Sequence, residues 1–432
     1  MNKPELISPA GTLEKLKTAF NFGADAVYVG VPDFSLRARI NNFTYSKVNQ
    51  GTKYAHAKNK KIYTTLNIYA HNRHLEKTKK AIKKYKDAGV DALIISDPGI
   101  LSIAKKIAPK IDLHLSTQAN CTNWQSAKFW YEHGVKRIIL AREVTLKEIA
   151  EIHKRLPKLE LEYFVHGAMC MSYSGRCILS KLLSERSANL GACSQPCRWE
   201  YDITEHTIDF PLTKAGTSFC APPLCKGGYC DITVAEKNGK QLHLEQDQHG
   251  TYILNSKDLC LIKYLAELTK AGISSFKIEG RTKSAYYVAA ITKLYRQTID
   301  NNYNPPKNYE DELKKITNRG YTTGFLFGEE KCEHNFKESH RKCDWQFVGE
   351  VIKNKKNILR IKVHNGLYIT DEIEFITPIG ENIKLKLDNL QDAKTGKPLN
   401  EVHGGQNQIA VISVNPDFII PDGSMLRRKL SY

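Results

Sequence analysis

Residues 61–97 read KIYTTLNIYAHNRHLEKTKKAIKKYKDAGVDALIISD, and they predict a strand, an amphipathic helix and a second strand in that order. The apolar residues of KIYTTLNI and DALIISD run almost without interruption, as is typical of parallel strands that helices cover. The segment between them has apolar residues at helical spacing, and Gly89 follows it as a left-handed helix cap. This stretch therefore predicts one strand–helix–strand unit of an α/β protein.

The same pattern recurs on both sides of this unit. Eight strands are predicted at residues 5–10, 24–30, 61–68, 91–97, 111–117, 136–141, 159–167 and 274–280. Eight strand–helix units predict a TIM-like (β/α)8 barrel. A doubly wound open sheet is the alternative, but no G-x-G-x-x-G follows the first strand, which disfavours a dinucleotide-binding fold.

The chain is predicted to divide into two domains. Residues 1–330 form the barrel domain. The connection between strands seven and eight has more than a hundred residues, far beyond an ordinary connection, which predicts a cysteine-rich insertion at 167–251. A hydrophilic linker at 331–345 leads to residues 346–432, where segments such as FVGEVIKN, DEIEFITP and NQIAVISV alternate polar and apolar residues. That alternation predicts a small antiparallel β-barrel, which would dock RNA or another domain, or serve stability alone.

Polar residues stand where the predicted strands end. In a barrel these ends share the carboxyl-terminal rim, where active sites are built, so their convergence predicts a site. The residues are Ser8, Asn67, Ser96, Asp97, Ser116, Thr117, Gln118, Arg142, Glu143, His166, Glu279, Gly280 and Arg281.

Four cysteines, Cys170, Cys177, Cys193 and Cys197, crowd into the segment directly after strand seven. The amino terminus has no basic segment followed by an apolar run, so we expect a cytoplasmic protein in which crowded thiols bind metal rather than form disulfides. The gaps do not fit the paired C-x2-C knuckles of a zinc ribbon, whereas an irregular loop suits an iron–sulfur cluster. Unligated buried thiols are the alternative.

Other cysteines have weaker assignments. Three more cysteines follow in the insertion, Cys220, Cys225 and Cys230. They would form a second metal site, supply an alternative ligand to the first metal site, or have no role in metal binding. Cys121 follows strand five and Cys260 is predicted to open a helix; both are expected to be packed thiols.

The composition favours a polyanionic partner. The 432 residues include 64 Lys or Arg and 46 Asp or Glu, a formal net charge of +18. This surplus favours nucleic acid, although any single run such as KTKKAIKKYK is also typical of a solvated helix face. No stretch approaches the length of a membrane span, so no membrane partner is expected.

The run EYFVHGAMCMSYSGRCILS at 162–180 resembles the signature of the collagenase-like peptidases of family U32. The segments 5–30, 249–262, 276–289 and 294–300 resemble the same family, so that the likeness covers most of residues 4–330. The resemblance implies an oxygen-independent hydroxylation protein with a 4Fe–4S cluster, because relatives of known role act in this way. Their substrates are the wobble uridine of tRNA, a ribosomal RNA cytidine or a ubiquinone precursor.

PCRWEY at 196–201, with HGTYILNSKDL and KIEGRTKS, is most similar to the branch that makes 5-hydroxyuridine in tRNA and depends on prephenate. The resemblance implies cluster ligation by the four crowded cysteines, with tRNA, iron–sulfur assembly proteins and electron donors as partners. PLCKGGY around Cys225 resembles the stretch that supplies the fourth ligand in a quinone-pathway relative, so Cys225 is the alternative to the favoured Cys197.

Several rim residues are candidates for chemistry. His166 or Glu279 would move protons, with His166 more natural near neutral pH. Arg281, Lys283 and Arg142 would hold phosphates or the carboxylates of the co-substrate. The alternative for Glu279 and Arg281 is an internal ion pair that closes the barrel.

Two other classes of function stay open. One is a protease. The chain contains neither the H-E-x-x-H nor the G-x-S-x-G motif, so it would have to use a pair such as Cys170 with His166 for proteolysis. A non-catalytic RNA-binding or assembly factor would carry a structural cluster.

Overall fold

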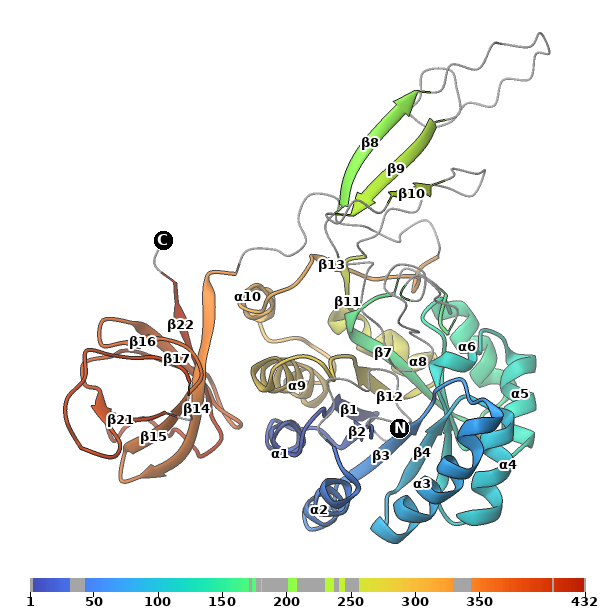
Figure 1. Ribbon diagram of the computed structural model, residues 1–432, viewed down its shortest axis with the longest axis horizontal. Helices are drawn as coiled ribbons and strands as arrows, with labels where there is room; N and C mark the ends of the chain where they lie inside the picture. Colours follow the sequence, from blue (N-terminus) through green and yellow to red (C-terminus); the bar gives the residue numbers. More distant parts are fainter. Residues whose placement is uncertain are drawn as a thin grey trace.

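The computed structural model describes residues 3–31, 43–170, 173–175, 180, 201–207, 230–236, 241–244, 256–328, 343–405 and 408–430. For 201–207, 230–236 and 241–244 the description is confined to the backbone. Figure 1 shows a helix-wrapped barrel and, beside it, a curved sheet formed by the carboxyl-terminal part of the chain.

Eight parallel strands in the described residues close into a barrel, which confirms the predicted TIM-like fold. Each strand pairs with the next in sequence order, and the last pairs with both the seventh and the first. They are β1 Glu5–Pro9, β2 Ala26–Val29, β3 Lys61–Leu66, β4 Ala92–Ile95, β5 Asp112–Leu115, β6 Arg137–Ile139, β7 Glu160–Ala168 and β12 Ile273–Ile278.

Helices surround this barrel (Figure 1). They are α1 Leu13–Asn21, α2 Tyr45–His56, α3 Leu75–Ala88, α4 Pro98–Ile107, α5 Trp124–Glu132, α6 Leu146–Arg155, α8 Leu265–Lys270 and α9 Ala285–Asp300. Side chains that accept backbone N–H groups start several of them, for example Thr12 at α1 and Ser284 at α9. At the end of α3, Gly89 has φ +69, the left-handed conformation predicted for it. None of the described helices is long and apolar enough to cross a membrane.

Further strands lie between β7 and β12. The antiparallel strands β8 Tyr201–Thr207, β9 Cys230–Glu236 and β10 Gln241–Leu244 form a small sheet that Figure 1 shows beyond the barrel. β11 Asp258–Cys260 then pairs antiparallel with β7, and β13 Tyr321–Thr322 lies alongside β11. The prediction that Cys260 opens a helix is wrong, because its backbone pairs with His166 and the 3-10 turn η7 Ile262–Tyr264 starts later.

The carboxyl-terminal part forms the predicted antiparallel barrel-like sheet. Its strands lie in the order β18-β17-β22-β14-β15-β21-β19 and curl around a core of their own, which includes Leu359, Phe375 and Leu426. The strands are β14 Trp345–Lys355, β15 Ile358–Val363, β17 Glu372–Ile376, β18 Ile383–Lys386, β19 Gln391–Asp392, β21 Ile409–Ser413 and β22 Met425–Lys429. A separate ladder joins β16 Leu367–Tyr368 and β20 Glu401–Val402.

A buried ion-pair network docks this sheet on the barrel. The side chain of Arg427 on β22 is fully buried and lies 2.7 Å from both Glu312 and Glu374. Glu312 belongs to α10 Tyr309–Lys314, which follows α9, and Arg427 also donates a hydrogen bond to Tyr286 of α9 at 3.2 Å. Because a buried charge that loses its partner is strongly destabilising, this network holds the two parts in one arrangement.

A second contact between the two parts predicts a pH-dependent stability. Burial, and then the neighbouring Glu14 carboxylate, raises the pKa of Glu350 on β14 from 4.5 to about 7. Because the folded protein holds the Glu350 proton more tightly than the unfolded chain does, protonation of this carboxyl stabilises the fold. The stabilisation is fully present at pH below 4.5 and is lost as the pH rises through 7. Glu350→Gln is therefore expected to raise the melting temperature more at pH 8 than at pH 5. Thermal melts at both pH values test this, with exposed Glu372→Gln as the control; equal shifts at both pH values would contradict it.

Candidate active site at the barrel mouth

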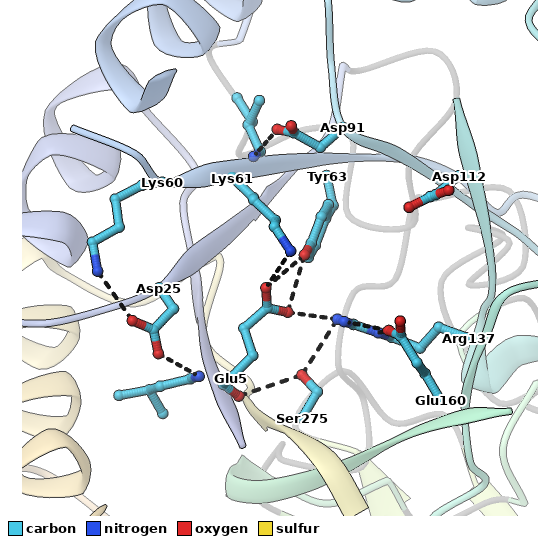
Figure 2. Close-up of polar contacts among 12 residues, drawn as sticks. Glu5, Asp25, Lys60, Lys61, Tyr63, Asp91, Asp112, Arg137, Glu160 and Ser275 are labelled. Carbon is cyan, nitrogen blue, oxygen red and sulfur yellow. Dashed lines mark hydrogen bonds and ion pairs between the residues drawn. The ribbon is translucent and has the colours of Figure 1, made fainter. Parts of the chain in front are cut away.

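The interior of the barrel is charged at its amino-terminal end. The carboxylate of Glu5 accepts a hydrogen bond from the Tyr63 hydroxyl at 2.8 Å and lies 2.6 Å from the Arg137 guanidinium (Figure 2). Arg137 also lies 2.6 Å from Glu160 and 3.3 Å from Glu162. Since these residues lie at the starts of their strands, the network serves stability rather than chemistry at the opposite rim.

Above this network, three side chains gather around Tyr28. The ammonium of Lys277 lies 4.3 Å from the centroid of the Tyr28 ring and 2.5 Å from Glu162. The Tyr28 hydroxyl donates a hydrogen bond to Glu279 at 3.3 Å, and the Arg281 guanidinium lies 5.6 Å from the same ring. The structure thus brings the predicted residues Glu279 and Arg281 together inside the mouth. Sequence reasoning missed Tyr28 and Lys277, although a lysine within the apolar strand SSFKIEG was a usable signal.

Buried acceptors without hydrogen-bond partners lie at the ends of β3 and β4. Asn67 donates from Nδ2 to Ser116 at 3.0 Å, but its Oδ1 and the hydroxyl of Ser96 have no partner in the described residues. Arg281 donates to Thr65 of β3 at 3.2 Å. Because buried polar atoms are normally paired, these atoms mark a place where a polar ligand would complete the hydrogen bonding.

Arg142 adds a positive charge to the same rim. Its guanidinium lies 4.2 Å from the centroid of the Phe164 ring, and the side chain is 8% exposed. No carboxylate lies within ion-pair distance of it in the described part of the chain. A largely desolvated guanidinium that lacks a counter-anion suits a carboxylate or phosphate of a ligand.

Three predicted rim residues face elsewhere. Ser8 shares a 2.8 Å hydrogen bond with Thr292 of α9, and Asp97 caps the amino terminus of α4. His166 also faces α9, where its ring nitrogen lies 3.3 Å from the Tyr295 hydroxyl. Burial lowers the pKa of His166 to about 4, so the imidazole is neutral at pH 7 and packs among tyrosines away from the mouth. Glu279 is therefore the better-placed proton carrier.

The beginning of the cysteine segment lies across the mouth. Ser174 accepts a hydrogen bond from the backbone N–H of Arg142 at 3.3 Å and donates its own N–H to Glu143 at 2.8 Å. Thr117 lies 3.4 Å from the Ser174 hydroxyl, and the next residue, Gly175, accepts a hydrogen bond from Tyr69. These contacts tie the segment that follows β7 to the ends of β5, β6 and β3.

Among the proposed cluster ligands, the structure describes Cys170. Cys177, Cys193, Cys197 and the alternative Cys225 lie outside the described residues, as does Cys220, and Cys230 begins β9. No group of three or more metal-binding side chains occurs in the described ranges.

Cys170 differs from the packed thiols in being accessible. It follows β7 by two residues, its thiol is exposed and it forms no disulfide. By contrast, burial raises the pKa of Cys121 to about 12 and that of Cys260 to about 11, as expected of packed thiols. An accessible thiol at the mouth fits the thiolate donor that an iron–sulfur cluster needs.

Gly167 in the signature is required by the close approach of two strands. Its φ is +107, and a Cβ atom there would lie 2.5 Å from the carbonyl oxygen of Glu279. Gly167→Ala is therefore expected to destabilise the protein by about 2–4 kcal/mol and to displace Glu279. Urea unfolding checks this, with Gly380→Ala as the control because a Cβ there meets no atom within 4 Å. Equal losses in the two variants would show that backbone strain alone, and not the contact with β12, is responsible.

Fold and site together define a TIM-like barrel protein with a polar, charged mouth, which residues 174 and 175 after β7 contact. The chain matches the family model for peptidase family U32 over residues 11–336 and the model for the U32 C-terminal domain over residues 343–427. The protein therefore belongs to peptidase family U32.

Three relatives show the range of this family. The chain is 41% identical to tRNA hydroxylation protein P of Haemophilus influenzae over 91% of its own length and 89% of the relative. It is 36% identical to the 23S rRNA 5-hydroxycytidine C2501 synthase of Escherichia coli, over 90% of the chain and 50% of the relative. It is 28% identical to a collagenase of Porphyromonas gingivalis, over 93% and 94% of the two chains.

Proposed function

We propose that this protein hydroxylates C5 of the wobble uridine of tRNA, forming 5-hydroxyuridine without molecular oxygen and with prephenate as co-substrate. The observation that carries the proposal is the 41% identity, over nine-tenths of both chains, to a tRNA hydroxylation protein. The relative named as a 5-hydroxycytidine synthase supports the same kind of change, a hydroxyl group at C5 of a pyrimidine. The net charge of +18 suits a polyanionic substrate.

A 4Fe–4S cluster held by Cys170, Cys177, Cys193 and Cys197, with Cys225 as the alternative fourth ligand, belongs to this proposal. Such a cluster would supply single-electron transfer or Lewis acidity near the bound base. It would also require assembly and electron-donor proteins, in a cytoplasmic setting where thiols stay reduced.

The side chains of the mouth have distinct roles in this proposal. Arg142 and Arg281 would bind the carboxylates of the co-substrate, because guanidinium groups pair with carboxylates in a planar, bidentate geometry. Glu279, held by Tyr28, would accept the proton that leaves C5 as the new C–O bond forms. The co-substrate would give up its hydroxyl oxygen to C5 and keep the electron pair of its own broken C–O bond. Asn67 and Ser96 offer hydrogen-bonding atoms for the edge of the base. The wobble base is unstacked at little cost because it lies in a single-stranded loop.

A protease is the second candidate, since one relative is named a collagenase. It would need a nucleophile paired with a base, and the sequence offered Cys170 with His166 for this role. The imidazole of His166 is engaged with Tyr295 on the outer side of β7, and no contact joins it to the Cys170 thiol in the described residues. The geometry therefore disfavours a protease that uses Cys170 with His166.

Mass spectrometry of tRNA nucleosides from a deletion strain tests the proposal. Wobble 5-hydroxyuridine and its derivatives should disappear and should return with the wild-type gene but not with Glu279→Gln. If those nucleosides persist in a strain that lacks any other hydroxylase, the tRNA assignment is wrong. A Glu279→Gln protein that restores them in full would favour the non-catalytic factor, and metal-free protein that degrades gelatin would favour the protease.

A further inference from the structure

Positive charge is concentrated in one part of this chain. Residues 43–90 contain twelve Lys or Arg but two Asp or Glu, and so account for more than half of the net charge of +18. The segment forms α2, β3, the 3-10 turn η3 Asn72–His74 and α3. Because α2 and α3 pack against each other, the charge lies on one side of the barrel (Figure 1).

The lysines of this segment differ in their partners. At the amino-terminal end of β3, the ammonium of Lys60 lies 3.0 Å from the Asp25 carboxylate, and that of Lys61 lies 3.6 Å from the Glu5 carboxylate. On α3, Lys77, Lys80 and Lys83 are exposed, and none has a carboxylate within ion-pair distance in the described residues. Like charges three residues apart on a helix repel each other, so this arrangement is unfavourable until a polyanion binds.

This basic helix begins at the barrel mouth. The loop from β3 to α3 carries His71 and Arg73, both exposed, and the hydroxyl of Tyr69 in the same loop contacts the cysteine segment at Gly175. Partial burial, and then the charges of Arg73, His71 and Lys77, lowers the pKa of His74, which indicates a positive potential at this end. From here the fourteen residues of α3 extend about 21 Å away from the mouth.

We propose that Arg73, Lys77, Lys80 and Lys83 form a binding surface for the sugar–phosphate backbone of the anticodon stem of tRNA. This α3 basic face rests on the proposed function and adds to it the surface on which the substrate docks. The phosphates of the stem would lie along α3 while the wobble base, a few nucleotides away, enters the mouth beside Tyr69. Lysines contribute here as point charges, so the face positions the RNA without reading its sequence.

The test is tRNA binding by a triple variant, Lys77→Glu with Lys80→Glu and Lys83→Glu. Titration of a fluorescent, unmodified tRNA transcript should show affinity reduced by about tenfold or more, with a salt dependence shallower by about two to three phosphate contacts. The matched control is Lys110→Glu with Lys154→Glu and Lys158→Glu. These exposed lysines lie after or at the ends of α4 and α6, at the opposite end of the barrel. The control changes the net charge equally and should bind within about twofold of wild type.

Melting temperatures establish that both variants fold, and the corresponding Lys→Gln set replaces the Lys→Glu set if the latter unfolds. Equal affinities in the two triple variants would overturn the α3 basic face. Unchanged tRNA affinity together with lost binding to vesicles of phosphatidylcholine and phosphatidylglycerol would also overturn it, in favour of a lipid surface. The proposed function fails separately, if wild-type protein does not restore 5-hydroxyuridine to the deletion strain, whatever the α3 variant binds.

Discussion

Replacing Cys170 with Ala is expected to give a colourless protein that has lost most of the roughly four irons per chain expected of the wild type. The reason is that Cys170 is an exposed thiol at the barrel mouth, and the loss of one of four thiolate ligands would weaken the binding of the cluster. Iron and sulfide content and the visible absorbance after anaerobic purification measure the effect. Cys177→Ala and Cys193→Ala should behave in the same way.

Cys121→Ala is the control for this experiment. Cys121 is also a cysteine near the carboxyl-terminal end of a barrel strand, but it is 1% exposed and its thiol is packed in the core. Its replacement should leave the iron content unchanged. Wild-type protein that is iron-free after anaerobic preparation, or that holds zinc, would contradict the cluster assignment altogether.

Arg137→Met is expected to lower the free energy of unfolding by about 3–5 kcal/mol, because it removes the cation from a buried network. The side chain of Arg137 is 6% exposed and lies beside the Glu5 carboxylate (Figure 2). Without it, the carboxylates of Glu5 and Glu162 would lose their shared partner. Urea unfolding at pH 7 measures the loss.

The matched control for this prediction is Arg155→Met, which removes an ion pair with Glu151 and a cation–π contact with Trp124 on the surface of the protein. Both side chains of that pair are half exposed, so the change should stay within about 1 kcal/mol. If the two variants lose equal stability, the buried network does not hold the barrel together as its geometry indicates.

The barrel could be predicted because its signals are local. The strand predicted at 136–141 is observed as Arg137–Ile139, and the one predicted at 61–68 as Lys61–Leu66. Apolar runs and capping residues lie within a few positions of the elements that they specify. The short strands β11 and β13 were missed, since each has three residues or fewer and exists through pairing with distant parts of the chain.

Part of the candidate site was also predictable. Glu279, Arg281 and Asn67 were expected at the rim and lie inside the mouth, where Tyr28, Thr65 and Ser116 contact them. Ser116 was also expected at the rim, whereas Tyr28 and Thr65 carry no signal that separates them from ordinary strand residues. Their roles follow from neighbours on other strands.

By itself the sequence determines that eight strand–helix units follow one another, and hence that polar residues collect at one end of a barrel. The tertiary structure decides which of those side chains point inward, because alternate residues of a strand face opposite sides and the barrel register sets the choice. Thus Asn67 faces the mouth, whereas Ser8 faces α9. His166 also faces α9, because the pairing of β7 with β12 shifts register between Phe164 and His166 and reverses the alternation there. Burial there, which no local pattern encodes, also lowers the pKa of His166 to about 4 and leaves the imidazole neutral.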